Sequence, residues 1–259
     1  MTASTDPSPA PSGSHVTCTV TDGIADVRLD RPDKLNALSL DMLQALRGTA
    51  RALRREPGLR AVVVSGNGRS FCAGLDLASA ARRPGAVARA FVPSPRGTNL
   101  FQEACWAWRR LPVPVVAAVH GHVIGAGVQI ALAADLRVTA PDARWSVKEV
   151  AHGLVPDMSG VRALTQLVGI ETAKRLTFTA DEISGADAVR LGLAGTVGDT
   201  PREDALALAT RIAAHRPAAL TAAKRLFDKH WSAGDLRTFA AERSAQLRLL
   251  PGAMRGLRR

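Results

Sequence analysis

Two segments of this 259-residue chain share one local design. Each has a short valine-rich run, then a turn rich in glycine and alanine, then a stretch of helical composition: AVVVSGNGRSFCAGLDL at 61–77 and VPVVAAVHGHVIGAGVQIALAADLR at 113–137. Buried strands that alternate with helices predict an α/β fold. The small residues let an oxygen atom approach backbone N–H groups closely, so the two turns could together form an oxyanion hole. They could equally be ordinary turns in which small residues allow tight packing.

The order of the other elements indicates an α/β core followed by helices. Alternating apolar and polar residues on both sides of Asp22-Gly23 predict a hairpin. A helix with Ser39 as its N-cap is expected next, and DLRVTAP at 135–141 predicts a further buried strand. From Ser159 onward, helical patterns replace strand patterns. We therefore expect a disordered tail over residues 1–14, an α/β core over 15–195 and a helical C-terminal region over 196–259.

The composition indicates which cellular compartment and which kinds of partner to expect. A net charge of +11, nearly all from arginine, favours an anionic partner, either nucleic acid or a phosphate-bearing small molecule. No basic stretch is interleaved with aromatic residues, which disfavours nucleic acid. No apolar run approaches the ~18 residues of a membrane span, and residues 1–14 lack the apolar core of a signal peptide. The three cysteines show neither disulfide nor metal-site spacing, so we expect a cytoplasmic protein with no bound metal.

Four motifs, in order along the chain, resemble those of one family. They are RPDKLNALS at 31–39, FCAGLDL at 71–77, GHVIGAGVQIALAADLR at 121–137 and WSVKEVAHGLVPDMSG at 145–160. Together they are similar to the crotonase family, the enoyl-CoA hydratases and isomerases. The resemblance implies a spiral core of ββα repeats with a helical C-terminal trimerisation region. It also implies that the substrate is an acyl-CoA thioester, with coenzyme A as part of the substrate and no separate cofactor.

The resemblance also assigns binding positions. The oxyanion hole would use the backbone N–H groups of Leu75 and Ala126, one from each glycine turn. Members usually form trimers or pairs of trimers, so we expect a homotrimer or hexamer. The CoA moiety would lie along five residues: Lys34, Leu35, Ala37, Ala73 and Asp76.

Only one of the two glutamates of a typical hydratase of this family has a match. Those enzymes hold a water molecule between two glutamates; Glu149 matches one of them, and Gln129 occupies the place of the other. An amide forms hydrogen bonds but neither takes nor gives a proton at ordinary pH. Losing one acid–base group typically costs ~10²–10⁴-fold in rate. Asp157 matches an aspartate of dienoyl-CoA isomerases and could hold or relay a proton, or it could cap the helix that begins near Ser159.

The resemblance and this acid–base inventory together favour a double-bond shift in an enoyl-CoA. Glu149 would take a proton from one carbon of the oxyanion-stabilised enolate system and return it to another. Three alternatives stay open: a 2-enoyl-CoA hydratase in which Gln129 positions the water for Glu149, a non-catalytic acyl-CoA-binding protein, and an RNA-binding protein. His152 is expected to be an ordinary loop residue, and the segment 78–100 a mobile loop that lines the acyl pocket.

Overall fold

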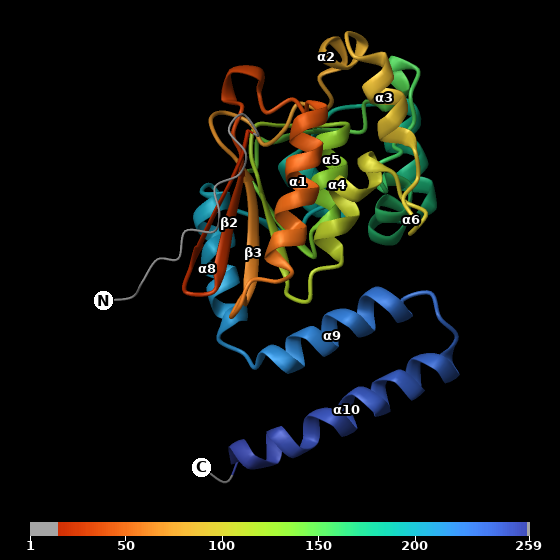
Figure 1. The fold of residues 1–259 in the computed structure, drawn as a ribbon. Helices are drawn as coiled ribbons and strands as arrows, with labels where there is room; N and C mark the ends of the chain where they lie inside the picture. The colour runs from red at the N-terminus through yellow and green to blue at the C-terminus, as the bar shows by residue number, and fades with distance from the viewer. Residues whose placement is uncertain (1–14, 258–259) are drawn as a thin grey trace.

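The computed structural model describes residues 15–257, so the expected tail over residues 1–14 lies outside the described part of the chain (Figure 1). A six-stranded sheet in the order β1-β2-β3-β4-β6-β9 forms the centre of the molecule. Its only antiparallel pair is β1 with β2, and the other neighbours are parallel. The strands are β1 (Val16–Thr21), β2 (Ile24–Leu29), β3 (Ala61–Gly66), β4 (Val115–Val119), β6 (Leu136–Thr139) and β9 (Thr196–Val197).

The hairpin at the sheet edge has the expected turn. Asp22 and Gly23 join β1 to β2 with φ angles of 51° and 77°. Two consecutive positive φ angles match the twist of the flanking strands, and glycine and aspartate tolerate them best. The predicted hairpin is therefore confirmed, as is Ser39, whose side chain accepts a hydrogen bond from the N–H of Met42 at the start of α1 (Leu40–Leu53).

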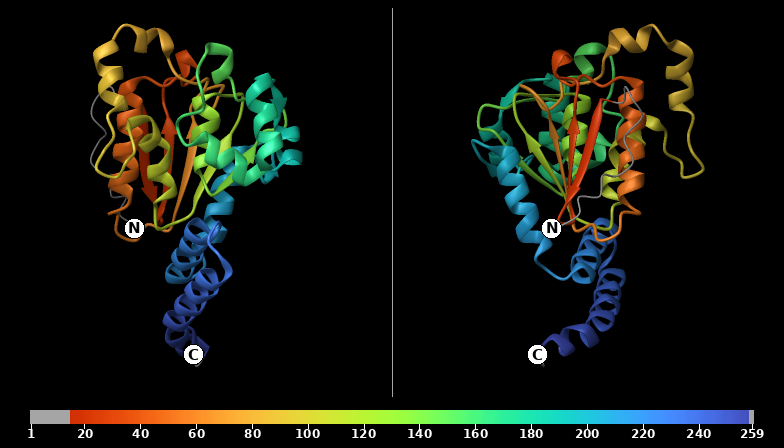
Figure 2. Two further views of the ribbon diagram at one scale, coloured as in Figure 1. Left: turned by 90° about the vertical axis from the view of Figure 1, so that its right-hand side faces the viewer. Right: turned by 60° about the vertical axis from the view of Figure 1, so that its left-hand side comes forward.

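Helices cover both faces of the sheet. Alternate residues of β3 point to opposite sides: Val62 and Val64 belong to the main apolar core, whereas Ala61 and Val63 belong to a smaller one. The main core packs under α1, α4 (Leu100–Arg109) and α5 (Ala126–Ala133), and the smaller core packs under α8 (Pro201–Ala213) (Figures 1 and 2). Both faces of the central strands are thus buried, as their valine-rich sequence predicts.

Short elements surround the carboxyl ends of the central strands. A second sheet in the order β5-β7-β8 consists of β5 (His122–Ile124), β7 (Arg144–Ser146) and β8 (Ile183–Ser184). The 3-10 turns η1 (Pro32–Lys34) and η2 (Glu149–His152) carry residues expected in the site. Two helices follow η2 along the chain: α6 (Gly160–Thr179), which is interrupted at Gly169, and α7 (Gly185–Leu191).

The segment 78–100 is mostly helical, whereas the sequence predicted a mobile loop. It contains most of α2 (Leu77–Ala81) and all of α3 (Pro84–Phe91). Asp76 caps α2 by accepting a hydrogen bond from the N–H of Ser79, and Pro84 opens α3. These are favourable helix starts, so the glycine and proline content that suggested a loop marks boundaries between short helices instead.

The last two helices form a pair at the C-terminal end of the described chain. Strand β9 pairs with β6, and α8 packs against the sheet, so both still belong to the core. Only α9 (Pro217–His230) and α10 (Asp235–Leu257) extend away from it as a pair (Figures 1 and 2). Within residues 15–257, no helix is both long enough and apolar enough to span a bilayer.

Candidate functional site

The two glycine turns lie side by side at the carboxyl ends of β3 and β4. The N–H of Cys72 donates to the carbonyl of His122 at 2.9 Å, and the N–H of Ile124 donates to the carbonyl of Cys72 at 3.0 Å. A Cβ atom at Gly127 would lie 2.3 Å from the Cys72 carbonyl oxygen. Only glycine fits there, so its small size brings the second turn against the first.

Each turn presents an unused backbone donor. The N–H groups of Leu75 and Ala126 make no hydrogen bond to any group among residues 15–257. Ala126 opens α5, where the first N–H groups have no partner within the helix. The preceding residues, Gly74 and Gly125, have φ angles of 102° and 52°, which residues with a side chain rarely adopt. Glycine therefore sets the local backbone direction at both candidate donors.

Both turns line a cavity of about 450 Å³. Seven of the predicted site residues line it: Ala73, Leu75, Asp76, Ala126, Gln129, Glu149 and Asp157. Lys34, Leu35 and Ala37 do not line this cavity but lie on the neighbouring strip of chain, where the carbonyl of Leu35 accepts from the N–H of Ala73 at 2.9 Å. The structure thus brings the acids and the candidate oxyanion donors into one chamber, with the predicted CoA positions at its border.

Gln129 connects Glu149 to the start of α6. Its side-chain Nε2 donates to Glu149 Oε1 at 2.6 Å, and its Oε1 accepts from the N–H groups of Met158 and Gly160 at 2.8 and 2.9 Å. Two backbone donors fix which end of the amide faces them, so the NH₂ end must face the carboxylate. The side chain is only 2% exposed, and a Cβ at Gly160 would lie 2.5 Å from its oxygen.

Glu149 keeps one carboxylate oxygen without a partner. Its Oε2 is buried and forms no hydrogen bond within the described part of the chain. A Cβ built on Gly125 would lie 3.5 Å from Oε1 and 3.7 Å from Oε2, so the carboxylate rests against the turn that leads to Ala126. The unpartnered oxygen is therefore available to a ligand bound beside the candidate oxyanion donors.

Burial shifts the pKa values of both acids in the chamber upward. For Glu149, burial raises the pKa and the neighbouring Asp157 adds to this, while the hydrogen bond from Gln129 lowers it in part. For Asp157, burial is the main cause of a raised pKa. Proton transfer is most efficient when the pKa of an acid or base approaches the working pH, so these shifts suit both groups to acid–base chemistry.

Asp157 does not cap α6. Ser159 occupies the cap position, with a φ of 77° and no side-chain cap bond, and Gln129 accepts from the N–H of Gly160, the first residue of the helix. His152 is exposed at the cavity border. Asp76 is already engaged, because it caps α2 and also forms an ion pair of 2.8 Å with Arg31.

Only part of the apolar walls of the cavity is expected from the sequence, namely the contribution of the segment 78–100. They come from α1, α3 and α4 and from the segment after η2, and include Leu43, Val87, Phe91, Phe101, Leu154 and Val155. In the sequence these residues look like ordinary members of amphipathic helices or loops. No local signal separates a leucine that faces a ligand chamber from one that faces the core.

Comparisons with known proteins identify the family. A family model for enoyl-CoA hydratase/isomerase matches residues 19–250. A short-chain-enoyl-CoA hydratase of Clostridium acetobutylicum is 32% identical over 210 residues, which cover 80% of this chain and 78% of that protein. The human mitochondrial Delta(3,5)-Delta(2,4)-dienoyl-CoA isomerase is 32% identical over 235 residues, covering 83% of this chain and 69% of that protein.

A solved structure of a Thermobifida fusca protein in complex with CoA superposes with a TM-score of 0.82. It is 32% identical, and the match covers 95% of this chain and 98% of that one. The expected crotonase fold is thus confirmed, and the chain belongs to the enoyl-CoA hydratase/isomerase family.

Proposed function

We propose that this protein shifts the double bond of an enoyl-CoA, with Glu149 as the only base that moves the proton. The observation that carries the proposal is the engagement of Gln129. Its oxygen is occupied by two backbone N–H groups and its nitrogen is bonded to Glu149. Hydration as it is known in this family uses a water held between two carboxylates, whereas here one carboxylate is replaced by an amide with no accepting atom to spare.

In the proposed reaction, the thioester oxygen binds the N–H groups of Leu75 and Ala126. These donors stabilise the negative charge that develops when Glu149 removes a proton from the carbon next to the carbonyl. The double bond then moves towards the carbonyl, and Glu149 returns the proton at the far end of the former double bond. Its Oε2 is the oxygen we expect to act, because Oε1 is bonded to Gln129. Asp157 could hold or relay a proton in longer conjugated systems.

A 2-enoyl-CoA hydratase is the second candidate, favoured by the identity to the Clostridium enzyme. In that reaction Glu149 would activate a water that the remaining N–H of Gln129 helps to place. The two candidates differ in one respect that can be measured. The shift needs a base and the oxyanion donors, whereas hydration also needs a water with a lone pair aimed at the substrate.

A paired assay tests the proposal. Wild type, Glu149→Gln and Gln129→Glu are each given crotonyl-CoA and, separately, a 3-enoyl-CoA, and products are separated by chromatography and identified by mass. Glu182→Gln, at an exposed ion pair with Arg144, is the matched control. We expect wild type to shift the 3-enoyl bond and to hydrate crotonyl-CoA poorly. Glu149→Gln should lose the shift, and Glu182→Gln should keep it.

Other results would point elsewhere. Efficient hydration by wild type would establish the hydratase and overturn the argument from Gln129. Binding of acyl-CoA without turnover of either substrate would indicate a binding protein. RNA binding that is tighter than acyl-CoA binding and falls steeply with salt would remove the priority of the enzyme.

We also propose that the CoA moiety lies along Lys34, Leu35, Ala37, Ala73 and Asp76. The Thermobifida fusca neighbour was solved with CoA, and the strip containing these residues borders the cavity. Lys34 is exposed and could face a CoA phosphate. Lys34→Ala should therefore raise KM several-fold with little change in kcat, which steady-state kinetics would show.

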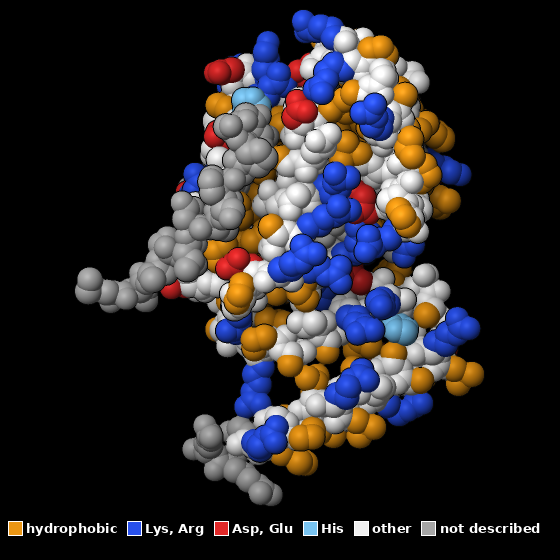
Figure 3. All heavy atoms as spheres, in the orientation of Figure 1, with side chains coloured by type: hydrophobic (Ala, Val, Ile, Leu, Met, Phe, Trp, Pro, Cys, Tyr) orange, Lys and Arg blue, Asp and Glu red, His pale blue; other side chains and the backbone are white. Residues whose placement is uncertain are grey.

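We further propose that the chain assembles as a trimer or hexamer through α9 and α10. These helices pack on each other and carry exposed large apolar residues, among them Phe227, Trp231 and Leu236, the last 86% exposed (Figure 3). Apolar side chains gathered on a protruding element are typical of an interface. A monomer by light scattering at micromolar concentration would contradict this.

A further inference from the structure

We propose that Phe91 and Phe101 close the far end of the acyl chamber, so that the preferred substrates carry an apolar acyl chain of limited length. This inference rests on the proposed function, since it concerns the substrate of the same site. The two rings contact each other with centroids 4.7 Å apart, and both line the cavity that contains Glu149.

The part of the chamber between α1, α3 and α4 has apolar walls. The charged and titratable side chains that line the cavity, apart from the engaged Asp76, come from Lys148–Asp157. The opposite wall is formed by residues with no polar side-chain atoms: Leu40, Leu43, Ala80, Val87, Phe91 and Phe101. An acyl chain that leaves the oxyanion donors in this direction meets only apolar surface. A hydroxylated or carboxylated chain would lose its hydration there without gaining a partner.

The aromatic pair is held in place by its neighbours. Phe101 is 5% exposed and sits in the first turn of α4, which begins with a capping box between Asn99 and Gln102. Phe91 is the last residue of α3. The chain that follows it returns to α4 through a turn in which the N–H of Ser94 donates to the carbonyl of Thr98 at 2.8 Å.

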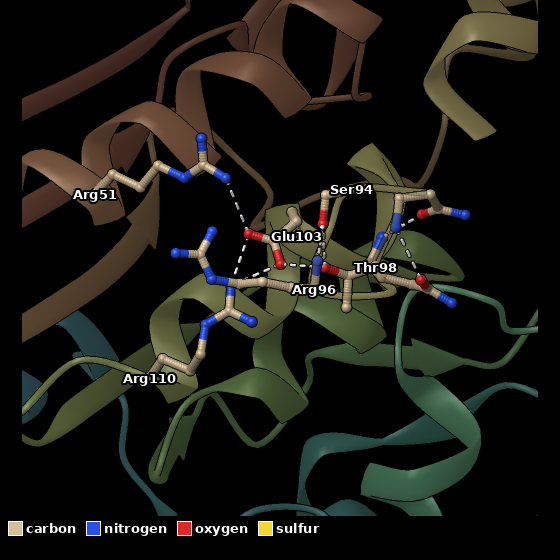
Figure 4. Close-up of polar contacts among 8 residues, drawn as sticks. Arg51, Ser94, Arg96, Thr98, Glu103 and Arg110 are labelled. Carbon is tan, nitrogen blue, oxygen red and sulfur yellow. Dashed lines mark hydrogen bonds and ion pairs between the residues drawn. The ribbon is translucent and has the colours of Figure 1, made fainter. Parts of the chain in front are cut away.

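That turn is anchored on a buried carboxylate (Figure 4). Thr98 Oγ1 donates to Glu103 Oε1 at 2.5 Å, and Glu103 also accepts from Arg110 and, at 3.3 Å, from Arg51. Arg51 belongs to α1 and Arg110 directly follows α4, so three parts of the chain meet at Glu103. The turn that follows Phe91 is therefore tied to the helices behind it.

A chain-length series tests the inference. We expect kcat/KM for 3-enoyl-CoAs to rise about fourfold for each methylene group that the chamber can bury, and then to fall once the chain reaches the aromatic pair. The substrates would run from hexenoyl-CoA through octenoyl- and decenoyl-CoA to dodecenoyl-CoA. In Phe91→Ala the optimum should move to a longer chain, with the ratio of long-chain to short-chain kcat/KM raised about tenfold or more.

Two further variants keep the test decisive. Phe91 is half-exposed, so Phe91→Ala should fold, and Phe101→Leu makes a milder change at the buried partner. Phe178→Ala, on α6 and 71% exposed, is the matched control and should keep the wild-type optimum. An optimum that stays the same in both Phe91→Ala and Phe101→Leu would overturn the inference.

Failure of the inference and failure of the proposed function give different results. If wild type turns over 3-enoyl-CoAs but shows no length optimum, the inference fails and the function stands. If wild type turns over none of them, the proposed function fails, and calorimetric Kd values for saturated acyl-CoAs of the same lengths test the chamber alone. If the chain length with the lowest Kd becomes longer in Phe91→Ala, Phe91 limits the length of the chamber. If that chain length does not change, the inference is refuted.

Discussion

Two buried glutamates of this protein have opposite surroundings. Glu103 is bonded to two arginines and a threonine hydroxyl, whereas Glu149 has one amide donor and an oxygen with no partner in the described chain. Burial raises the pKa of both, but hydrogen bonds from Arg110 and Thr98 outweigh it at Glu103, where the pKa is lowered. At Glu149 the hydrogen bonds do not outweigh burial, and the pKa is raised.

The difference separates a carboxylate that supports the fold from one suited to chemistry. A charge whose lone pairs are all occupied is stable in its ionised form and has nothing left to offer a substrate. A charge left partly unsatisfied in a buried site is unfavourable for folding, but it can take a proton. The predictions below aim to break or sharpen this contrast.

The largest expected effect is on the rate of the double-bond shift in Glu149→Gln. Removing the base should lower kcat/KM by ~10²–10⁴-fold, measured with a 3-enoyl-CoA. Thermal stability should stay the same or rise, because the variant removes a buried charge that is only partly satisfied. A large loss of stability together with activity would mean that Glu149 is structural and would erase the contrast with Glu103.

The second effect is on stability, in Glu103→Gln. Losing charge-assisted hydrogen bonds from Arg110 and Arg51 should lower the free energy of unfolding by about 1–3 kcal/mol, measured by urea denaturation at neutral pH. Because the folded-state pKa is lowered, the stabilisation by Glu103 is present above its unfolded pKa and lost as the pH falls through the folded pKa. The variant should therefore lose less stability than wild type on acidification, while keeping turnover of short-chain substrates.

A smaller effect, on the pH dependence of activity, is expected from Gln129→Met. This variant tests whether the amide of Gln129 lowers the pKa of Glu149. The bond from Gln129 lowers the pKa of Glu149, so its loss should raise that pKa further. Activity needs the ionised base, so the acid limb of the kcat/KM profile should move to higher pH. In wild type this limb should already lie above the ~4.3 of an ordinary glutamate.

Gln129→Glu gives the matched comparison for that experiment. When protonated, the new carboxyl can donate to Glu149 as the amide does. Shift activity should therefore approach wild type in the pH range where the two carboxyls share one proton, and fall as that proton is lost. An acid limb at the same pH in wild type and Gln129→Met would show that the amide does not tune the base.

The smallest effect is expected from His152→Ala. The imidazole is exposed at the cavity border and bonds to neither acid. Its removal should change kcat/KM less than tenfold in the assay used for Glu149→Gln. A loss as large as that of Glu149→Gln would assign His152 a direct part in the reaction and weaken the proposal of a single base.

Much of the core could be predicted because its signals are local. A few neighbouring residues are enough to predict the Asp22-Gly23 turn, the Ser39 cap and the valine-rich strands. Strands β8 and β9 have two residues each, too few for an alternating pattern, so they were missed. The pairing of β9 with β6 is a long-range contact, which no local pattern reveals.

The site was predictable in part. The four motifs located Glu149, Gln129 and Asp157, and the structure brings all three to one cavity. The bonds from Met158 and Gly160 to Gln129 depend on how α6 packs on α5, which no spacing reveals. The Phe91–Phe101 contact joins two helices across a turn, and a hydrophobic pattern alone does not distinguish it from core packing.

Since the position of residue 127 against the Cys72 carbonyl leaves no space for a Cβ, the two turns cannot vary independently. Any side chain at 127 would push them apart and move both candidate donors at once, even in a protein that still folds. Engineering a new acyl specificity should therefore diversify the apolar wall and leave this contact untouched. The two turns therefore behave as a single structural unit, although separate parts of the sequence encode them.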